Sequence, residues 1–143
     1  MYVIFEGLDD LIKESEKIAN QSELDKLNKK ILLKCGDVVA KELKPKVTRS
    51  KDVSRSGNKG SRTFEHAADN INVSKIKNTK GTKFIFIGWK RGKNAPFNYM
   101  QYEEWGNTTR PPKPMLHPTI EEVKPELNEI AVKEYEELIN KLK

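Results

Sequence analysis

Apolar positions in the first third of the chain recur at helical spacing. A stripe over residues 8–19 predicts a first helix. A longer stripe follows, and we expect Ser22 to cap this second helix, with Asp25 completing a capping box. Because Pro45 disfavours helix at the residue before it, the second helix is expected to end near Lys44. The second stripe comprises Leu24, Leu27, Ile31, Cys35, Val38 and Leu43.

The middle of the chain changes to strand-like patterns. Residues 72–77 alternate between apolar and polar, and residues 83–89 are mostly β-branched or aromatic. A polar, glycine-containing turn separates them, so we expect an antiparallel hairpin. Residues 97–105 return as a predicted third strand, which a short polar connection would place beside the second in a meander. The aromatic residues that suggest this third strand are Tyr99, Tyr102 and Trp105.

Three further elements complete the prediction. Tyr2–Phe5 is a short β-like run, and residues 62–71 have the spacing of a short helix. Prolines keep the backbone extended up to Pro118, the expected start of a long C-terminal helix in which Pro125 either resets the start or causes a kink. The fold class that follows is α+β. It is a curved antiparallel sheet, a meander of about three to four strands, packed by two N-terminal helices, a short middle helix and the C-terminal helix.

Residues 46–61 show no periodicity and are rich in Ser, Gly and Lys, which predicts a long flexible loop. Two interpretations remain open for it. It is either a solvated loop, or a loop that orders against an acidic partner or lies near DNA phosphates. The basic residues expected to face a partner or DNA are Arg49, Lys51, Arg55 and Lys59.

Composition narrows the classes of function. A chain of 143 residues is most simply one domain, over residues 1–143. Apolar residues make up 36% and charged residues 34%, so either part of the chain is loose or part of its burial comes from partners. The net charge of +6 permits contact with nucleic acid without requiring it. No run of residues resembles a membrane span or a signal peptide, and we expect a cytosolic protein.

The candidate chemistry is sparse. Cys35 is the only cysteine, and its place on an apolar stripe favours a buried small hydrophobe over a reactive thiol. His66 has no identifiable partner carboxylate, and no nucleotide, metal or nucleophile motif is present, so we expect no catalytic, cofactor or metal site. If they lie on a strand, Glu103 and Glu104 point to opposite faces and cannot share a site. Trp89 followed by Lys90, Arg91 and Lys93 could form a nucleic-acid surface or a plain solvated loop.

The order of these elements resembles the tail-component family of long-tailed bacteriophages, the tail completion or head–tail joining proteins. The resemblance covers most of the chain in order, and most tightly residues 66–118. Two steps depart from the family's pattern, since Asn107 follows Gly106 where threonine is usual and Met115 follows Pro114 where phenylalanine is usual. The segments that carry the resemblance are His66-Ala-Ala-Asp-Asn-Ile71, Phe84-Ile-Phe-Ile-Gly88, Tyr99-Met-Gln-Tyr-Glu-Glu-Trp-Gly106 and Pro114-Met-Leu-His-Pro118.

The resemblance implies a non-enzymatic structural protein of the phage neck, present in the virion and in the host cytoplasm during assembly. It implies a ring, commonly hexameric, at the head-proximal end of the tail. The ring would contact a head-closure protein on one side and a tail terminator or tail tube protein on the other. DNA would pass through its lumen. The alternative from another class is a small basic nucleic-acid-binding module.

The most concentrated candidate site is the stretch from the aromatic residues to the prolines. It offers more large apolar surface than one short sheet face needs, and interfaces favour Tyr, Trp, Met and Arg. We therefore expect contacts between subunits or with a partner here, with the acidic side chain of Glu103 or Glu104 meeting the basic loop of a neighbour. The residues expected to make these contacts are Tyr102, Glu104, Trp105, Asn107, Arg110, Met115 and Leu116.

Overall fold

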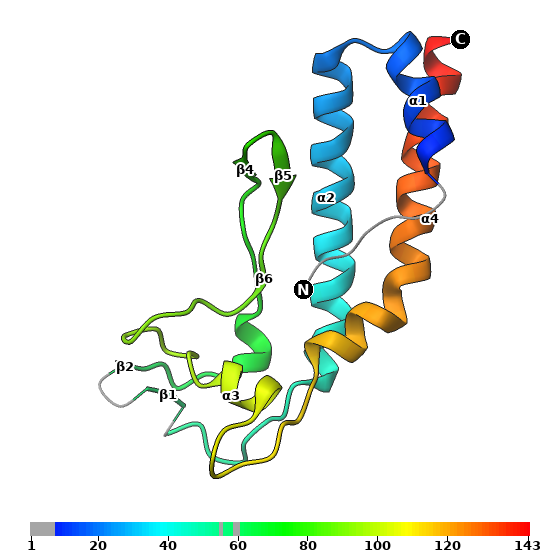
Figure 1. Cartoon of the computed structure of the whole chain (residues 1–143). Coiled ribbons are helices and arrows are strands. Elements are labelled where there is room, and N and C mark those ends of the chain that lie inside the picture. The colour runs from blue at the N-terminus through cyan, green and yellow to red at the C-terminus, as the bar shows by residue number, and fades with distance from the viewer. Residues whose placement is uncertain (1–7, 55, 59–60) are drawn as a thin grey trace.

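The computed structural model describes residues 8–54, 56–58 and 61–143. Three helices, α1 (Asp9–Ile18), α2 (Gln21–Leu43) and α4 (Leu116–Leu142), lie side by side, and the short strands gather beyond α2 (Figure 1). The predicted strand Tyr2–Phe5 lies outside the described residues. Within the part of the chain that the structure describes, no helix is long and apolar enough to cross a membrane.

Both predicted N-terminal helices are confirmed, but the cap of the second is not the expected one. The side chain of Asn20 accepts from the backbone N–H of Glu23 at 2.9 Å. The Glu23 carboxylate accepts in return from the backbone N–H of Asn20 at 3.0 Å. This is the reciprocal capping box, two residues earlier than the predicted pair of Ser22 and Asp25. The helix ends at Leu43, next to the predicted boundary.

The helices enclose the larger of two hydrophobic clusters. Two polar side chains at its edge are paired: the Tyr135 hydroxyl donates to Asn28 Oδ1 at 2.7 Å, and the buried Glu134 carboxylate pairs with Lys30 at 2.7 Å and with Lys34. Such pairing is what allows a carboxylate to be buried. The buried members of this cluster are Leu8, Leu27, Ile31, Cys35, Val39, Ile120, Val123, Leu127, Ala131 and Tyr135.

The predicted hairpin is confirmed, and it consists of two separate pairs of strands. Nearest the helices, β3 (Asn72–Val73) pairs with β6 (Ile87–Gly88). Further out, β4 (Lys77–Thr79) pairs with β5 (Thr82–Phe84), and both pairs are antiparallel. The turn residues Lys80 and Gly81 have φ angles of 51° and 84°. Two consecutive positive φ values give the turn whose twist matches the strands it connects.

Gly36 lets this hairpin lie directly on α2. A Cβ atom at this position would come within 2.6 Å of Ile85 Cδ1 and 2.8 Å of Val73 Cγ1. The structure therefore shows a close contact between α2 and the hairpin at Gly36. The neighbouring Cys35 is buried in the helical cluster, which confirms the prediction of a buried small hydrophobe.

The predicted third strand is wrong. Residues from Met100 to Trp105 form helix α3, so that the meander does not extend beyond the hairpin. Phe97, Met100 and Glu104 are all buried, at spacings of three and four residues, which is the period of a helix face. The α+β class is confirmed. Among the described residues the strands form separate two-stranded sheets rather than one curved sheet.

The segment after α2 is partly regular. It begins with a 3₁₀ turn, η1 (Lys44–Lys46), and includes a small pair of strands, β1 (Gly57–Asn58) with β2 (Ser61–Arg62). Arg55 and Lys59 lie outside the described residues, and the flexibility of the loop stays a prediction. The short helix predicted over residues 62–71 is a 3₁₀ turn, η2 (Ala67–Asn70).

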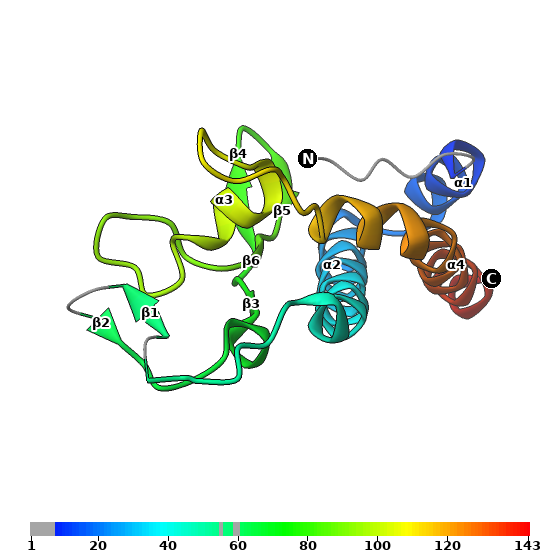
Figure 2. The same cartoon turned by 90° about the horizontal axis from the view of Figure 1, so that it is seen from below.

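A second hydrophobic cluster lies below the helices, where α3 meets η2 and the start of α4. Helix α4 begins at Leu116, with Pro118 in its first turn, and continues through Pro125 without interruption. Its first turns run at an angle to the rest, as Figures 1 and 2 show, which is the expected effect of an internal proline. The buried members of the second cluster are Leu43, Val47, Ala67, Ala68, Phe97, Met100 and Met115.

We expect Gly36→Leu to separate the hairpin from α2, because a side chain at this position would overlap Val73 and Ile85. The expected loss is about 1–3 kcal/mol of the free energy of unfolding, the usual cost of overpacking. Chemical denaturation measures the loss, and amide hydrogen exchange over residues 72–88 locates it. Asp37→Leu is the matched control, since Asp37 is exposed on the same helix. Equal effects of the two substitutions would contradict the close contact.

The Cys35 thiol is expected to react slowly in the folded chain. Burial raises its pKa from 9.0 to about 11, so that the reactive thiolate near pH 8 is roughly a hundredfold rarer than for an ordinary thiol. A thiol reagent followed by absorbance should therefore label the native protein slowly and the urea-unfolded protein quickly. Equal rates in both states would show that the cluster opens readily around Cys35.

Candidate partner-contact site

The carboxylate of Glu104 caps helix α4 from a different element of the chain. Its Oε2 accepts from the backbone N–H groups of Met115 at 2.6 Å and Leu116 at 3.0 Å. Its Oε1 accepts from the N–H of His117 at 3.0 Å. Glu104 is only 8% exposed, so these bonds also satisfy a buried charge. The negative carboxylate also lies where a helix dipole favours negative charge.

The first turn of α4 is thereby fully paired. Pro118 has no N–H to satisfy, and the N–H of Thr119 donates to the Met115 carbonyl at 3.2 Å. The hydroxyl of Thr119, which is fully buried, donates to the same oxygen at 2.6 Å. Helix starts leave four backbone donors without partners inside the helix, and here a distant carboxylate supplies what a local cap usually does.

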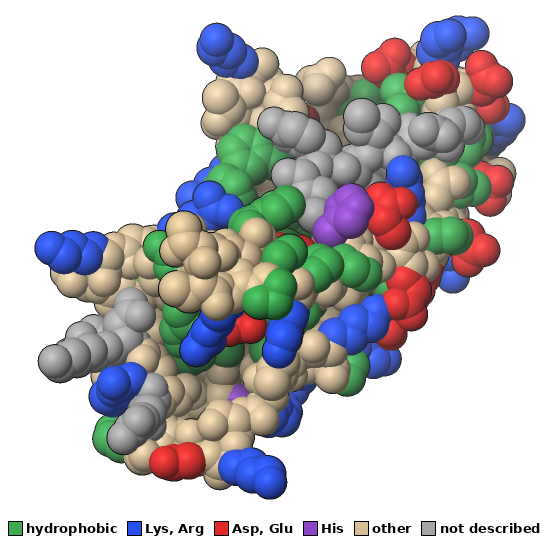
Figure 3. Space-filling view, turned by 60° about the horizontal axis from the view of Figure 1, so that its bottom comes forward, with side chains coloured by type: hydrophobic (Ala, Val, Ile, Leu, Met, Phe, Trp, Pro, Cys, Tyr) green, Lys and Arg blue, Asp and Glu red, His purple; other side chains and the backbone are tan. Residues whose placement is uncertain are grey.

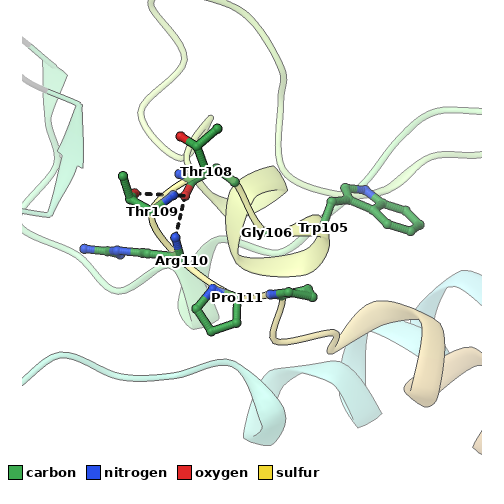
Figure 4. Close-up of a pocket in the computed structure, with 8 residues that line it drawn as sticks. Trp105, Gly106, Thr108, Thr109, Arg110 and Pro111 are labelled. Atoms are coloured by element: carbon green, nitrogen blue, oxygen red, sulfur yellow. Dashed lines mark hydrogen bonds between the residues drawn. The ribbon is translucent and has the colours of Figure 1, made fainter.

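The loop after α3 is held in one shape by its own polar groups. Gly106 ends the helix with φ 74°, and a Cβ atom there would lie 2.8 Å from the nitrogen of Pro112. Asn107 Oδ1 accepts from the backbone N–H groups of Thr109 at 2.9 Å and Arg110 at 2.8 Å. The Asn107 N–H donates to the Arg110 carbonyl at 3.0 Å, which closes a tight turn. Figure 4 shows hydrogen bonds of this loop, which end on Thr109 and Arg110, beside the short helix.

Two contacts attach this loop back to α3. Arg110 Nη1 lies 3.2 Å from Glu103 Oε1, and the N–H of Lys113 donates to the Glu103 carbonyl at 2.7 Å. Between the loop and the end of the helix lies an open hollow of about 520 Å³, bounded by Trp105 and Pro112. Figure 4 shows the Trp105 ring directed away from the loop. We call helix α3 and the loop over residues 106–113 the unit. The unit therefore presents a shaped surface with little internal freedom.

The structure divides the predicted contact residues into two groups. Trp105 is 66% exposed and Tyr102 is 47% exposed, and Asn107 and Arg110 are also at the surface. Glu104 and Met115 are buried, and Leu116 is half-buried against both hydrophobic clusters. The first group can meet a partner, whereas the second group holds the first in place. The expectation that Glu103 or Glu104 meets a neighbour's basic loop is not supported, because Arg110 and α4 already occupy their carboxylates.

The basic loop is partly engaged within the chain. Arg49 forms two bonds with the Asp69 carboxylate, at 2.8 and 2.9 Å, and Lys44 lies 3.2 Å from the same group. The Arg49 and Lys44 cations lower the pKa of Asp69 to about 2. Arg49 is therefore committed to η2, whereas Lys51 is exposed. The remaining predicted residues of this loop, Arg55 and Lys59, are not among those described.

The other candidate surface, around Trp89, is not laid out for base stacking. The Trp89 indole N–H donates to the Ala67 carbonyl at 2.8 Å, and the ring is half-buried against the second cluster. Lys90, Arg91 and Lys93 are exposed in the loop that follows. A stacking platform needs an accessible ring face beside the cations, and here the Trp89 ring packs against the second cluster instead.

No catalytic grouping emerges among the described residues. His66 precedes η2, His117 lies in the first turn of α4, and the carboxylates of Glu103 and Glu104 serve different partners. The structure brings together no group of three or more His, Cys, Asp or Glu side chains suited to a metal ion in residues 8–54, 56–58 and 61–143.

The cap is the feature that sequence reasoning missed. Glu104 follows Met100 by four residues and Phe97 by seven, so it lies on the apolar stripe of a short helix. A charged residue on a buried stripe needs a partner, and the proline-rich start of α4 offers no side-chain cap of its own. Together, these two features could have indicated that Glu104 caps α4. They were overlooked because the aromatic composition of residues 97–105 suggested a strand.

Glu104→Ala should lower the free energy of unfolding by about 2–3 kcal/mol, because it leaves three backbone donors of α4 without an acceptor. Glu104→Gln should lose less, since one amide oxygen can still accept. Urea unfolding followed by circular dichroism measures both. Glu103→Gln is the matched control, because its carboxylate lies at the surface and such ion pairs contribute under about 1 kcal/mol. A loss at Glu103 as large as that at Glu104 would contradict the capping role.

Comparison with known proteins identifies the family. A family model described as "Bacteriophage HK97-gp10, putative tail-component" matches residues 9–106, more than half of the chain. A search of curated proteins and a search of solved structures each gave no match. The matched region includes α1, α2, the hairpin and α3 up to Gly106. The resemblance seen in the sequence is thus confirmed, and the chain belongs to the HK97 gp10-like family of bacteriophage tail components.

Proposed function

We propose that this tail protein forms a ring at the head-proximal end of the phage tail and joins the tail to the neck. The observation that carries the proposal is the exposed pair Trp105 and Tyr102 on a rigid unit. The two rings are three residues apart on helix α3 and so lie on neighbouring positions of its surface, and an exposed apolar patch of this kind marks a contact site with another protein. The contacts are made to the next protein of the neck or tail, such as a head-closure protein, a tail terminator or a tail tube protein.

The construction of the unit supports this function. Helix α3 turns Glu104 inward and Trp105 outward, and the loop turn at Asn107 is closed by its own hydrogen bonds. A surface that is already ordered loses less conformational entropy when it binds. Arg110 lies on the same loop, and aromatic residues with Arg are typical of the centres of interfaces. This arrangement favours assembly over chemistry, and we propose a structural protein without enzymatic activity.

The passage of DNA through the ring is part of the same proposal. Exposed basic residues such as Lys51 could line the lumen and offer phosphates a weak, sequence-independent contact. The partly buried Trp89 argues against the alternative of a dedicated nucleic-acid-binding module, since it cannot offer a full stacking face. A binding site that gripped DNA would also hinder its movement.

Trp105→Ala should leave the fold intact and impair incorporation into tails. Because the side chain is 66% exposed, we expect a change in the free energy of unfolding within about 0.5 kcal/mol. Loss of a central aromatic contact should reduce the copies per tail roughly tenfold or more. The measurement is quantitative mass spectrometry of purified particles from a phage that carries the substitution, alongside thermal unfolding of the isolated protein.

Leu33→Ala serves as the control for this experiment. Leu33 is also a large exposed apolar residue, at 45%, but lies on α2 away from the unit. It should change neither stability nor incorporation. Normal numbers of the Trp105 variant in tails would rule out this surface as the contact, and absence of the unaltered protein from purified tails would overturn the proposed function itself.

A further inference from the structure

The charge of the chain is strongly divided between its two parts. Residues 44–115 carry sixteen Lys and Arg against five Asp and Glu, a net charge of +11. Residues 8–43 and 116–143 together carry eleven basic against fifteen acidic residues, a net charge of −4. Residues 8–43 and 116–143 form the three long helices, whereas residues 44–115 form the strands, α3 and the loops. The net +6 of the whole chain conceals this asymmetry.

The acidic part has an organised outer face. Three exposed glutamates of α4, Glu126, Glu129 and Glu136, are separated by three and seven residues and so fall on one face of the helix. Lys133 is an exposed base that lies among these three. None of the three glutamates has an ion-pair partner among the described residues, unlike the buried Glu134 on the opposite side of the helix. We call these three residues the acidic stripe.

The basic part ends in a loop that is similarly unpaired. Between β6 and α3, the side chains of Lys90, Arg91 and Lys93 are exposed, and no described residue forms an ion pair with them. The loop has a fixed base, because the N–H of Gly92 donates to Asn98 Oδ1 at 3.2 Å. We call these three basic residues the basic tip.

The acidic stripe and the basic tip lie at opposite ends of the molecule. In Figures 1 and 2 the loop between β6 and α3 extends away from the helices, on the other side of α2 from α4. Figure 3 shows acidic side chains gathered along the edge that carries α1 and α4, with basic side chains more frequent toward the other end. One copy therefore presents opposite charges on opposite sides.

We propose that copies of this chain associate head to tail, with the basic tip of one copy against the acidic stripe of the next. Two different surfaces on opposite sides generate a ring or a filament when the contact repeats. A second copy fits better than DNA, because the chain itself carries the complementary surface and neither surface forms an ion pair with another described residue. The inference rests on the proposed ring and assigns its contact between subunits, which leaves the Trp105 surface for the neighbouring neck protein.

The test uses charge reversal on each side. One variant changes all three residues of the basic tip to Glu, and a second changes all three residues of the acidic stripe to Lys. Each variant has like charges on both contact surfaces and should not self-associate. Mixed together, each offers the other a complementary surface, so association should return. A chain that carries both sets of reversals should also associate by itself.

Sedimentation velocity over a range of protein concentrations gives the readout. At low ionic strength, ~0.05 M, the average mass of the unaltered chain should rise with concentration, and at ~0.5 M it should fall to that of the monomer, because salt screens exposed charges. Each single-sided variant should weaken association at least roughly tenfold at low salt. Circular dichroism verifies folding, and versions with Gln at the same positions replace any variant that fails to fold.

A matched control separates a specific contact from net charge. Changing Lys13, Lys26 and Lys41 to Glu removes as much positive charge as reversal of the basic tip, at exposed helical positions that form no ion pair with any residue the structure describes. By itself, this control should associate to the same extent as the unaltered chain. Mixed with the acidic-stripe variant, it should associate to the same extent as the unaltered chain does in that mixture.

Three outcomes would overturn the inference. The unaltered chain could remain a monomer throughout at low salt, the reversed variants could associate as well as it does, or mixing them could fail to restore association. A basic-tip variant that loses binding to duplex DNA while the unaltered chain stays monomeric would assign the tip to DNA instead. Each of these results leaves the proposed function standing if the unaltered protein is found in purified tails.

Discussion

The carboxylate of Glu104 at the start of α4 is the interaction on which the lower half of the molecule depends. The connection between α3 and α4 is rich in proline, and α4 begins without a side-chain cap of its own. By accepting three backbone N–H bonds, Glu104 joins the end of one helix to the start of another. The same join brings Met100 and Met115 into one buried cluster. Since adjacent helical residues point about 100° apart, fixing Glu104 inward also fixes Trp105 outward.

That dependence explains which parts of the fold could be predicted from the sequence. Helices α1, α2 and α4 follow from apolar stripes long enough to give a clear period, and the hairpin follows from its turn residues. Helix α3 could not be recognised in the same way. It is six residues long, its composition is aromatic, and one of its buried positions is a glutamate. Its structure is determined by a contact with residues more than ten positions away, which local pattern does not record.

The candidate site was affected by the same error. On a strand, Tyr102 and Glu104 would share a face, and both would be equally available to a partner. On a helix they separate, so that the aromatic residues and Arg110 reach the surface while Glu104 and Met115 form its support. The contact region itself stays a prediction, and the side of the element on which each residue lies depends on the period of that element. The cap of α2 is a smaller error of prediction, because Asn20 caps the helix where Ser22 was expected. Either residue type can cap a helix, and only the fold selects between them.

A charged contact between copies would suit a part that has to remain soluble before it assembles. Exposed ion pairs are individually weak and are screened by salt, so the isolated chain would associate only slightly. In a ring, however, every copy makes two contacts, and the last contact is formed within an assembly whose ends are already held close together. Contacts too weak to hold a pair can therefore stabilise a closed ring, particularly when the tail holds the copies in place. The unequal distribution of charge along the chain, more than its net value, is what makes this possible.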